Sequence, residues 1–504
     1  MTTQPELETK ASAEATAPPD ARRRLDTSPQ QSPDSPEAAI VRLVVGHLRP
    51  GLPVVLWTGE TIGADRQADQ PNSPQPRRLT DLDVDSPYDP EAEPIGPRVR
   101  LRSPDVVSRL LRAPSLGTVI ELWAEGTLDI ENGSVLDAAV AYERARAADP
   151  RGFKHRLRTL PRGRIARMLP SLLPGAWRAK ARIALPGQRR FRAGGGRKEI
   201  GHHYDVSNAF YRLFLDERMV YTCAYFERDD MTLDEAQEAK LDLVCRKLRL
   251  REGERLLDIG CGWGALLIHA AERYGARGHG VTLSEEQAAL ARERIAERGL
   301  SDRITIELKP FEGLEGSSFD KIASIGMFEH VGLRHHDAYF RNVHRLLKPS
   351  GLYLHHAITR RMKTSKRAFG TKSAEHKALV RYIFPGGELD TLGLSVNGLE
   401  AHRFEVHDCE NLRPHYGRTC RMWAERLHAR MEEAVGEIGE PRARLWLLYL
   451  SGCALAFERG SVQINQTLAS KRKKGLVPVP WTRDDLYWSR PPRSSSHRNN
   501  PQTT

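Results

Sequence analysis

The residues with the clearest chemical meaning lie in one glycine-rich run, Asp258-Ile259-Gly260-Cys261-Gly262-Trp263-Gly264. Apolar residues precede the run, so it reads as a buried strand that ends in a tight turn and opens a helix. Glycines there let the backbone approach a ligand where a Cβ atom would collide. The spacing G-x-G-x-G is typical of S-adenosylmethionine (SAM) sites, whereas dinucleotide sites carry G-x-G-x-x-G. The alternative is an ordinary glycine-rich turn between a strand and a helix.

Polar and aromatic residues follow the next expected strands. Thr282, Ser284 and Gln287 come after the second strand, where their hydroxyls and amide can hold a sugar in place of the usual acidic residue. Ser284 also fits the N-cap of the next helix, and the two roles are compatible. Phe311-Glu312 follows the third strand, where an aromatic ring can cover an adenine, although a Phe is more often plain core.

Further candidates lie at the ends of the fourth and fifth strands. The segment Gly326–Gly332 contains the pair Glu329-His330, and His355-His356 ends the fifth strand. Because neighbouring residues of a strand face opposite sides, only one of the two histidines can face a cleft. Upstream, the aromatic and uncharged block Tyr221–Phe226 would suit a lid over an apolar substrate.

The elements that must position these residues alternate regularly from residue 200 onward. Strands are expected at 256–259, 278–283, 304–308, 321–326 and 351–357. Helices are expected at 233–248, 266–274, from 284, and at 339–347. This alternation predicts an α/β fold with a parallel, doubly wound sheet whose ligands bind at the carboxyl ends of the strands.

Composition divides the 504-residue chain further. Residues 1–37 are expected to be a disordered tail, 38–147 a small N-terminal α+β domain with a surface insertion at 65–97, and 471–504 a C-terminal tail. The catalytic domain is expected at 200–470. The apolar run Leu445–Phe457 is too short to span a bilayer and predicts a buried helix.

The segment 148–199 is strongly basic. The chain carries a net charge of +12, and residues 151–200 hold 15 Lys and Arg but one acidic residue. Leu160, Ile165, Met168, Leu169, Leu172 and Leu173 recur among the arginines at roughly helical spacing. The segment is therefore either an amphipathic helix on an anionic membrane or a solvated linker. We find no RNA-binding module, so we do not expect nucleic acid as a partner.

The six cysteines form no C-x-x-C pair, so we expect no metal site. So few cysteines in a long chain favour a reducing, cytoplasmic compartment. The N-terminus lacks the apolar core of a signal peptide.

Together these motifs resemble the cyclopropane-fatty-acyl-phospholipid synthase family. The likeness extends to about residue 470 and is carried by Tyr221–Phe226, Asp258–Gly264, Gly280–Gln287, Gly326–Gly332 and Arg381–Gly387. A weaker likeness around Ser115-Leu116-Gly117 and Trp123 favours the bacterial phospholipid enzymes, which own an N-terminal domain, over the shorter mycolic-acid cyclopropanators.

The resemblance implies a particular chemistry. A cis double bond of a phospholipid acyl chain attacks the SAM methyl group, and the resulting carbocation loses a proton to bound bicarbonate and closes a cyclopropane ring. The implied bicarbonate site comprises Cys223, Glu329, His356 and Tyr416 with the backbone of Ile358, and Cys453 as a further site cysteine. The SAM contacts would be Tyr221, Thr222, Asp258, Gly260, Gly262, Gly264, Thr282, Leu283, Gln287, Phe311 and Glu312. The resemblance also implies a homodimer bound peripherally to the inner face of the membrane.

Departures from the family pattern leave the product open. The segment 360–380 is longer and more basic than expected, and 65–97 and the tail lack counterparts. The same cation can instead yield an exomethylene group or, after reduction, a methyl branch. Other classes to weigh are an RNA methyltransferase, a small-molecule amine N-methyltransferase and an inactive lipid-binding protein.

Overall fold

The computed structural model describes residues 35–48, 50–63, 96–148, 155–156, 158–168, 206–316, 319–362 and 388–487. The expected N-terminal tail, most of the 65–97 insertion, most of the basic segment, the run 381–387 and the end of the C-terminal tail lie outside these residues.

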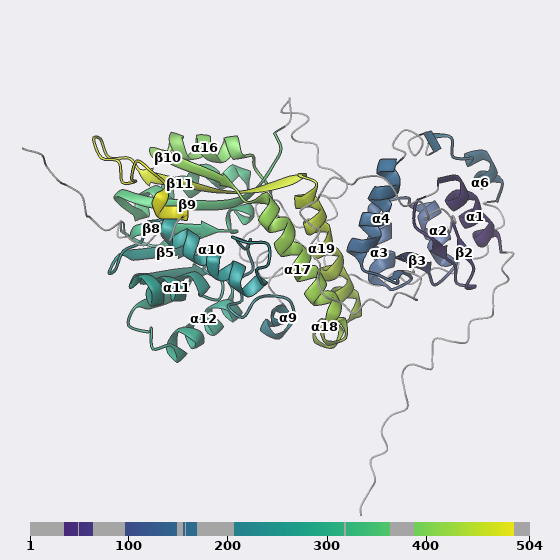
Figure 1. Cartoon of the computed structure of the whole chain (residues 1–504), viewed down its shortest axis with the longest axis horizontal. Coiled ribbons are helices and arrows are strands. Elements are labelled where there is room, and N and C mark those ends of the chain that lie inside the picture. The colour runs from purple at the N-terminus through teal and green to yellow at the C-terminus, as the bar shows by residue number, and fades with distance from the viewer. Residues whose placement is uncertain are drawn as a thin grey trace, which may run out of the picture.

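The larger, C-terminal part is built on a mixed sheet of seven strands in the order β10-β11-β9-β8-β5-β6-β7 (Figure 1). The strands are β5 (Arg255–Ile259), β6 (Arg277–Thr282), β7 (Ile304–Leu308), β8 (Phe319–Ile325), β9 (Leu347–Arg360), β10 (Phe404–Asn411) and β11 (Val462–Lys471). The strands from β9 to β7 are parallel, as predicted, but β11 is antiparallel to both β9 and β10. The α/β class is confirmed, and the two final strands are an addition that the sequence interpretation lacked.

Helices cover both faces of the sheet, which makes it doubly wound. On one face lie α10 (Leu233–Lys247), α11 (Ala265–Tyr274) and α12 (Glu285–Glu297), with the short α20 (Asp484–Tyr487) against α10. On the other lie α13 (His336–Leu346) and α16 (Leu392–Ala401). Thr232 and Glu235 form a reciprocal capping box that fixes where α10 begins.

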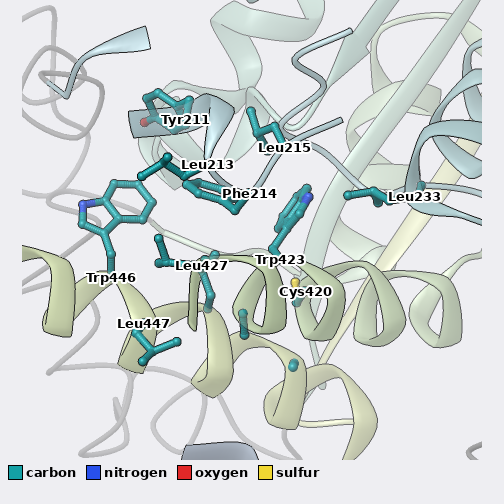
Figure 2. Close-up of a cluster of buried hydrophobic side chains, with 14 of the residues drawn as sticks. Tyr211, Leu213, Phe214, Leu215, Leu233, Cys420, Trp423, Leu427, Trp446 and Leu447 are labelled. Atoms are coloured by element: carbon teal, nitrogen blue, oxygen red, sulfur yellow. The ribbon is translucent and has the colours of Figure 1, made fainter. Parts of the chain in front are cut away.

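Three helices between β10 and β11 form a separate layer, α17 (Arg413–Ala429), α18 (Met431–Ile438) and α19 (Glu440–Glu458). Figure 2 shows Trp423 and Leu427 of α17 and Trp446 of α19 directed toward Tyr211 and Phe214 in and after α9 (Asn208–Arg212). The expected buried helix at 445–457 is thus confirmed as part of α19. Among the described residues, no helix has the length and apolar character needed to cross a membrane.

The N-terminal part forms its own small α+β unit. A four-stranded sheet, in the order β2-β1-β3-β4, packs with several helices around Ile40, Leu56, Val106 and Leu122. The elements are α1 (Pro36–Leu48), β1 (Val54–Val55), β2 (Thr61–Ile62), β3 (Arg98–Leu101), α2 (Asp105–Arg112), α3 (Leu116–Ala124), β4 (Leu128–Glu131) and α4 (Val135–Ala148).

The described part of the basic segment belongs to this unit. Helix α6 (Arg162–Met168) packs against α1, buries Ile165 and places Met168 against the small core. Arg162, Arg164 and Arg167 are exposed. The sequence left open whether the basic segment is a membrane-bound helix or a solvated linker. In the structure, part of the apolar face of α6 packs against the small N-terminal core.

Helix α19 joins the two units through Arg444. Its Nε donates to the Trp123 carbonyl (2.6 Å), and its Nη2 donates to Leu128 O (3.1 Å) and Asp129 Oδ1 (3.0 Å). Its guanidinium lies 4.2 Å above the Trp123 ring, whose Nε1 donates back to Arg444 O (2.8 Å). A largely buried cation with this many partners is a strong local link.

Arg444→Ala is therefore expected to lower the free energy of unfolding by about 2–3 kcal/mol, because the hydrogen bonds and the ring contact are lost together. Urea unfolding measures the change. Arg442→Ala, an exposed arginine on the same helix, is the matched control and should change stability by less than about 0.5 kcal/mol. Equal effects of the two substitutions would contradict the assigned link.

Candidate active site

A cavity of about 620 Å³ opens at the carboxyl ends of β5, β6 and β8. Ten of the eleven residues expected to contact SAM line it, namely Tyr221, Thr222, Asp258, Gly260, Gly262, Thr282, Leu283, Gln287, Phe311 and Glu312. Gly264 does not line it. Its φ is +82° at the start of α11, a left-handed conformation that favours glycine.

The glycine turn needs its glycines for two separate reasons. Gly260 has φ of +81°, a left-handed conformation that costs other residues energy. An added Cβ at Gly260 would also lie 2.9 Å from Cγ of Met327, another residue that lines the cavity. The backbone therefore forms the wall of the cavity at this point.

The residues after β6 and β7 combine structural and binding roles. Thr282 Oγ1 donates to Gln287 Oε1 (2.9 Å), and Ser284 caps α12 by accepting from Gln287 N (3.3 Å). The N-cap prediction for Ser284 is confirmed, while Thr282 and Gln287 face the cavity. Phe311 is buried, packs edge-to-face on Tyr339 at 5.3 Å and also lines the cavity, so it is both core and wall.

A buried lysine that the sequence interpretation missed also lines the cavity. Lys240 Nζ donates to Thr222 Oγ1 (3.1 Å), and one turn earlier Gln237 Nε2 donates to Thr222 O (2.8 Å). Burial lowers the pKa of Lys240 to about 8 and raises that of Asp258 to about 7, and each charge partly offsets the other's shift. The signal was present: the polar residues Gln237, Lys240 and Lys247 on the otherwise apolar face of α10 must have partners.

Glu329 lies in a short 3-10 helix, Phe328–His330, directly after β8. Its Oε1 accepts a hydrogen bond from Ile358 N (2.6 Å), whereas its buried Oε2 has no hydrogen-bond partner among the described residues. Burial raises the pKa of Glu329 to about 7 against the opposing effect of the Ile358 amide. The neighbouring His330, in contrast, lines the SAM cavity.

The two adjacent histidines of β9 face opposite sides, as predicted. His355 lies among Phe328, Tyr353 and Ser395 under α13 and α16, with its Nδ1 3.0 Å from Tyr353 Oη. His356 lies on the other face, where its Nδ1 is 3.0 Å from Gln466 Nε2 and its buried Nε2 has no partner within the described part of the chain. His356 is thus the histidine available to a site beside Ile358.

Tyr416 and the two cysteines meet on that same side. Tyr416 N donates to Leu412 O (3.0 Å), and Cys223 Sγ lies 3.8 Å from that carbonyl. Burial and the neighbouring Cys223 and Cys453 raise the pKa of Tyr416 well above its usual value. Burial also raises the pKa of the Cys223 thiol, and that of Cys453 to about 12, so both cysteines stay protonated.

The group behind the cavity is therefore contiguous with it. Tyr221-Thr222 and Gly326 line the cavity, Cys223 follows directly, and Gly326 N donates to His356 O (2.9 Å). The side chains of Ile358, Tyr416 and Cys453 pack against the aromatic cluster of α9, α17 and α19. Polar groups that lack hydrogen-bond partners among the described residues thus lie between this cavity and an apolar layer.

The raised pKa of Glu329 has a consequence for stability. The folded protein favours the neutral carboxyl, so its contribution is full below the ordinary pKa of 4.5 and is lost as the pH rises through about 7. Glu329→Gln stays neutral and can still accept from Ile358 N. We expect wild type to lose about 2 kcal/mol more than Glu329→Gln between pH 5 and pH 8. Urea unfolding at both pH values measures this, and parallel pH profiles would contradict it.

The sheet order, the glycine turn and the cavity at the strand ends define a SAM-dependent methyltransferase. The family model for mycolic acid cyclopropane synthetase matches residues 194–467, more than half of the chain, and the chain belongs to that family.

Individual relatives agree with this assignment. A probable fatty acid methyltransferase of Pseudomonas putida is 43% identical over 290 residues, which cover 57% of this chain and 73% of that protein. Cyclopropane mycolic acid synthase 1 of Mycobacterium tuberculosis is 39% identical over 274 residues, 53% of this chain and 95% of that protein. The structure of mycolic acid cyclopropane synthase CmaA1 complexed with SAH and CTAB superimposes with a TM-score of 0.52 at 38% identity, covering 55% and 99% of the two chains. The family match begins at residue 194, so the likeness of 98–147 to the phospholipid enzymes stays a prediction.

Proposed function

We propose that this enzyme methylates the cis double bond of unsaturated phospholipid acyl chains and forms a cyclopropane ring. The names of its relatives, a fatty acid methyltransferase and cyclopropane synthases, support a lipid alkene as substrate. One observation carries the proposal. Two buried polar atoms, Glu329 Oε2 and His356 Nε2, have no hydrogen-bond partner among the described residues and lie between the SAM cavity and an apolar aromatic layer.

Bicarbonate is proposed as the base, and the residues present fit such an anion. Glu329 Oε2, as a neutral carboxyl, and His356 Nε2 offer two contacts, and the Tyr416 hydroxyl, which stays protonated, offers a third. When bound, bicarbonate supplies a weak base that takes up the proton lost on ring closure. The site is compatible with a carbocation intermediate because the nearby thiols of Cys223 and Cys453 are protonated and therefore poor nucleophiles.

The reaction is tested by incubating the purified full-length protein with SAM and vesicles of cis-unsaturated phospholipid. We expect acyl chains to gain the mass of one CH2 group and to lose their double bond. A mass gain with a retained double bond would indicate an exomethylene product. This alternative product is considered because one relative is named only as a fatty acid methyltransferase. Unchanged acyl chains would refute the proposal.

We further propose that the enzyme is cytoplasmic, dimeric and bound peripherally to the inner face of the membrane, where its substrate resides. The exposed Arg162, Arg164 and Arg167 of α6 support attraction to anionic headgroups. Replacing all three by Gln is expected to weaken binding to anionic vesicles about 10²-fold, at about 1 kcal/mol per arginine, with SAM affinity unchanged. Vesicle sedimentation measures the binding.

A matched control removes the same charge elsewhere. Arg273, Arg298 and Arg341 are exposed on helices of the methyltransferase unit. Their triple replacement by Gln should leave vesicle binding nearly unchanged. If both triple variants lose binding equally, the attraction is a property of the total charge and not of α6.

A further inference from the structure

A line of hydrogen bonds runs across the sheet to His356. Glu410 of β10, Gln466 of β11 and His356 of β9 are directly paired across the strands, so their side chains share one face. Lys247, the last residue of α10, covers this row: its Nζ donates to Glu410 Oε2 and to Gln466 Oε1 (2.8 Å). The line ends where Gln466 Nε2 approaches His356 Nδ1 at 3.0 Å.

The direction of every bond in this line is determined by its first member. A lysine ammonium can only donate, so the amide of Gln466 must present its oxygen to Lys247 and its NH2 group to His356. An NH2 group can only donate in its plane, so His356 Nδ1 must accept and carries no hydrogen. The Lys247 side chain, Gln466 and His356 are fully buried. Burial, together with the positive charges of Lys240 and Lys247, lowers the pKa of His356 well below its usual value, which keeps the ring neutral.

We infer that Lys247 and Gln466 are positioning residues that lock His356 as the neutral tautomer with its hydrogen on Nε2. That nitrogen is buried without a partner in the part of the chain that the structure describes, on the strand that presents Ile358 N to Glu329. His356 therefore enters the reaction as a hydrogen-bond donor to an oxyanion and does not itself take the proton from the substrate. The identity of that oxyanion rests on the proposed function, whereas the tautomer does not.

The tautomer can be observed directly in the full-length protein without SAM or lipid. With ¹⁵N-labelled histidine, two-bond ¹H–¹⁵N correlation spectra separate protonated from unprotonated ring nitrogens, and the signal absent from His356→Gln assigns His356. We expect Nε2 protonated and Nδ1 unprotonated in the wild type. A hydrogen on Nδ1, or a charged ring at neutral pH, would overturn the inference.

Gln466→Glu tests the lock itself. A carboxylate can accept from Lys247 but can only accept from the ring, so the hydrogen should move to His356 Nδ1 and leave Nε2 as an acceptor. The matched control is Gln463→Glu, the same change three residues earlier on β11, which should leave the His356 signals unchanged. An unaltered tautomer in a folded Gln466→Glu protein would contradict the role of Gln466.

The functional consequence is a separate readout. Gln466→Glu should slow methyl transfer about 10²-fold, the usual cost of one donor to an anion, while SAM affinity stays within about 3-fold. Methyl transfer at the wild-type rate, with the tautomer reversed, would show that donation from Nε2 is not needed. If the wild type methylates no lipid, the proposed function fails and the spectra still decide the tautomer.

Discussion

Replacing Glu329 by alanine is expected to reduce methyl transfer by about 10²–10⁴-fold, the range for a residue that holds or moves a proton in the transition state. The Glu329 carboxyl reaches from the end of β8 to Ile358 N on β9, and its second oxygen, behind the SAM cavity, has no hydrogen-bond partner among the described residues. Because it does not line that cavity itself, SAM affinity should change by less than about 3-fold.

The measurement pairs initial rates of methyl transfer with calorimetric titration of SAM. Asp408→Ala removes another buried carboxyl. Asp408 lies on β10, away from the site, and pairs with Arg483. It should cost stability but leave the rate per folded molecule nearly unchanged. A Glu329→Ala enzyme as fast as Asp408→Ala would remove Glu329 from the catalytic group.

Gly260→Ala is expected to weaken SAM binding by about 30-fold or more, equivalent to about 2 kcal/mol. The new methyl group would lie 2.9 Å from Met327 Cγ at the cavity wall, so Met327 or the turn must shift into the volume that the ligand needs. The positive φ of +81° adds a cost of about 1–2 kcal/mol to folding itself.

Gly253→Ala separates the two effects. Gly253 has φ of +76°, but an added Cβ there meets nothing within 4 Å. Both variants should lose similar stability in urea unfolding, and only Gly260→Ala should lose SAM affinity in calorimetry. Equal SAM affinities would show that the turn tolerates a side chain and that the wall is formed elsewhere.

The sequence predicted the parts of this fold that are local. Strand β7 lies at the expected residues, the other four parallel strands deviate by a few residues at their ends, and Ser284 is an N-cap as expected. Each of these depends on hydropathy period or capping chemistry within about ten residues. Thr282, Gln287 and Phe311 line the cavity as the same rule predicts, because parallel strands end at one edge. The full set of SAM contacts came from the family resemblance and stays a prediction.

Most of the missed features depend on partners far away in the chain. Gln466 pairs with Lys247 across 219 residues, and β10 and β11 pair only after three helices have intervened. The antiparallel edge leaves no local pattern, and the polar residues on the apolar face of α10 indicate that they have partners but not which partners these are. Gly264 was assigned to the ligand because the motif spacing does not distinguish a glycine that lines the cavity from one that only gives the turn its positive φ.

Helix α19 contacts both the small N-terminal unit and the candidate site. Arg444 holds the small N-terminal unit, and the next residue, Leu445, packs against Ile120 and Ala124 of that unit, while Cys453 further along the helix approaches Tyr416. A shortened chain that begins near residue 194, where the family match starts, would expose the apolar side chains at this end of the helix to solvent. The same helix carries Cys453 of the candidate site. We therefore expect the methyltransferase unit to be less soluble alone than in the full-length chain.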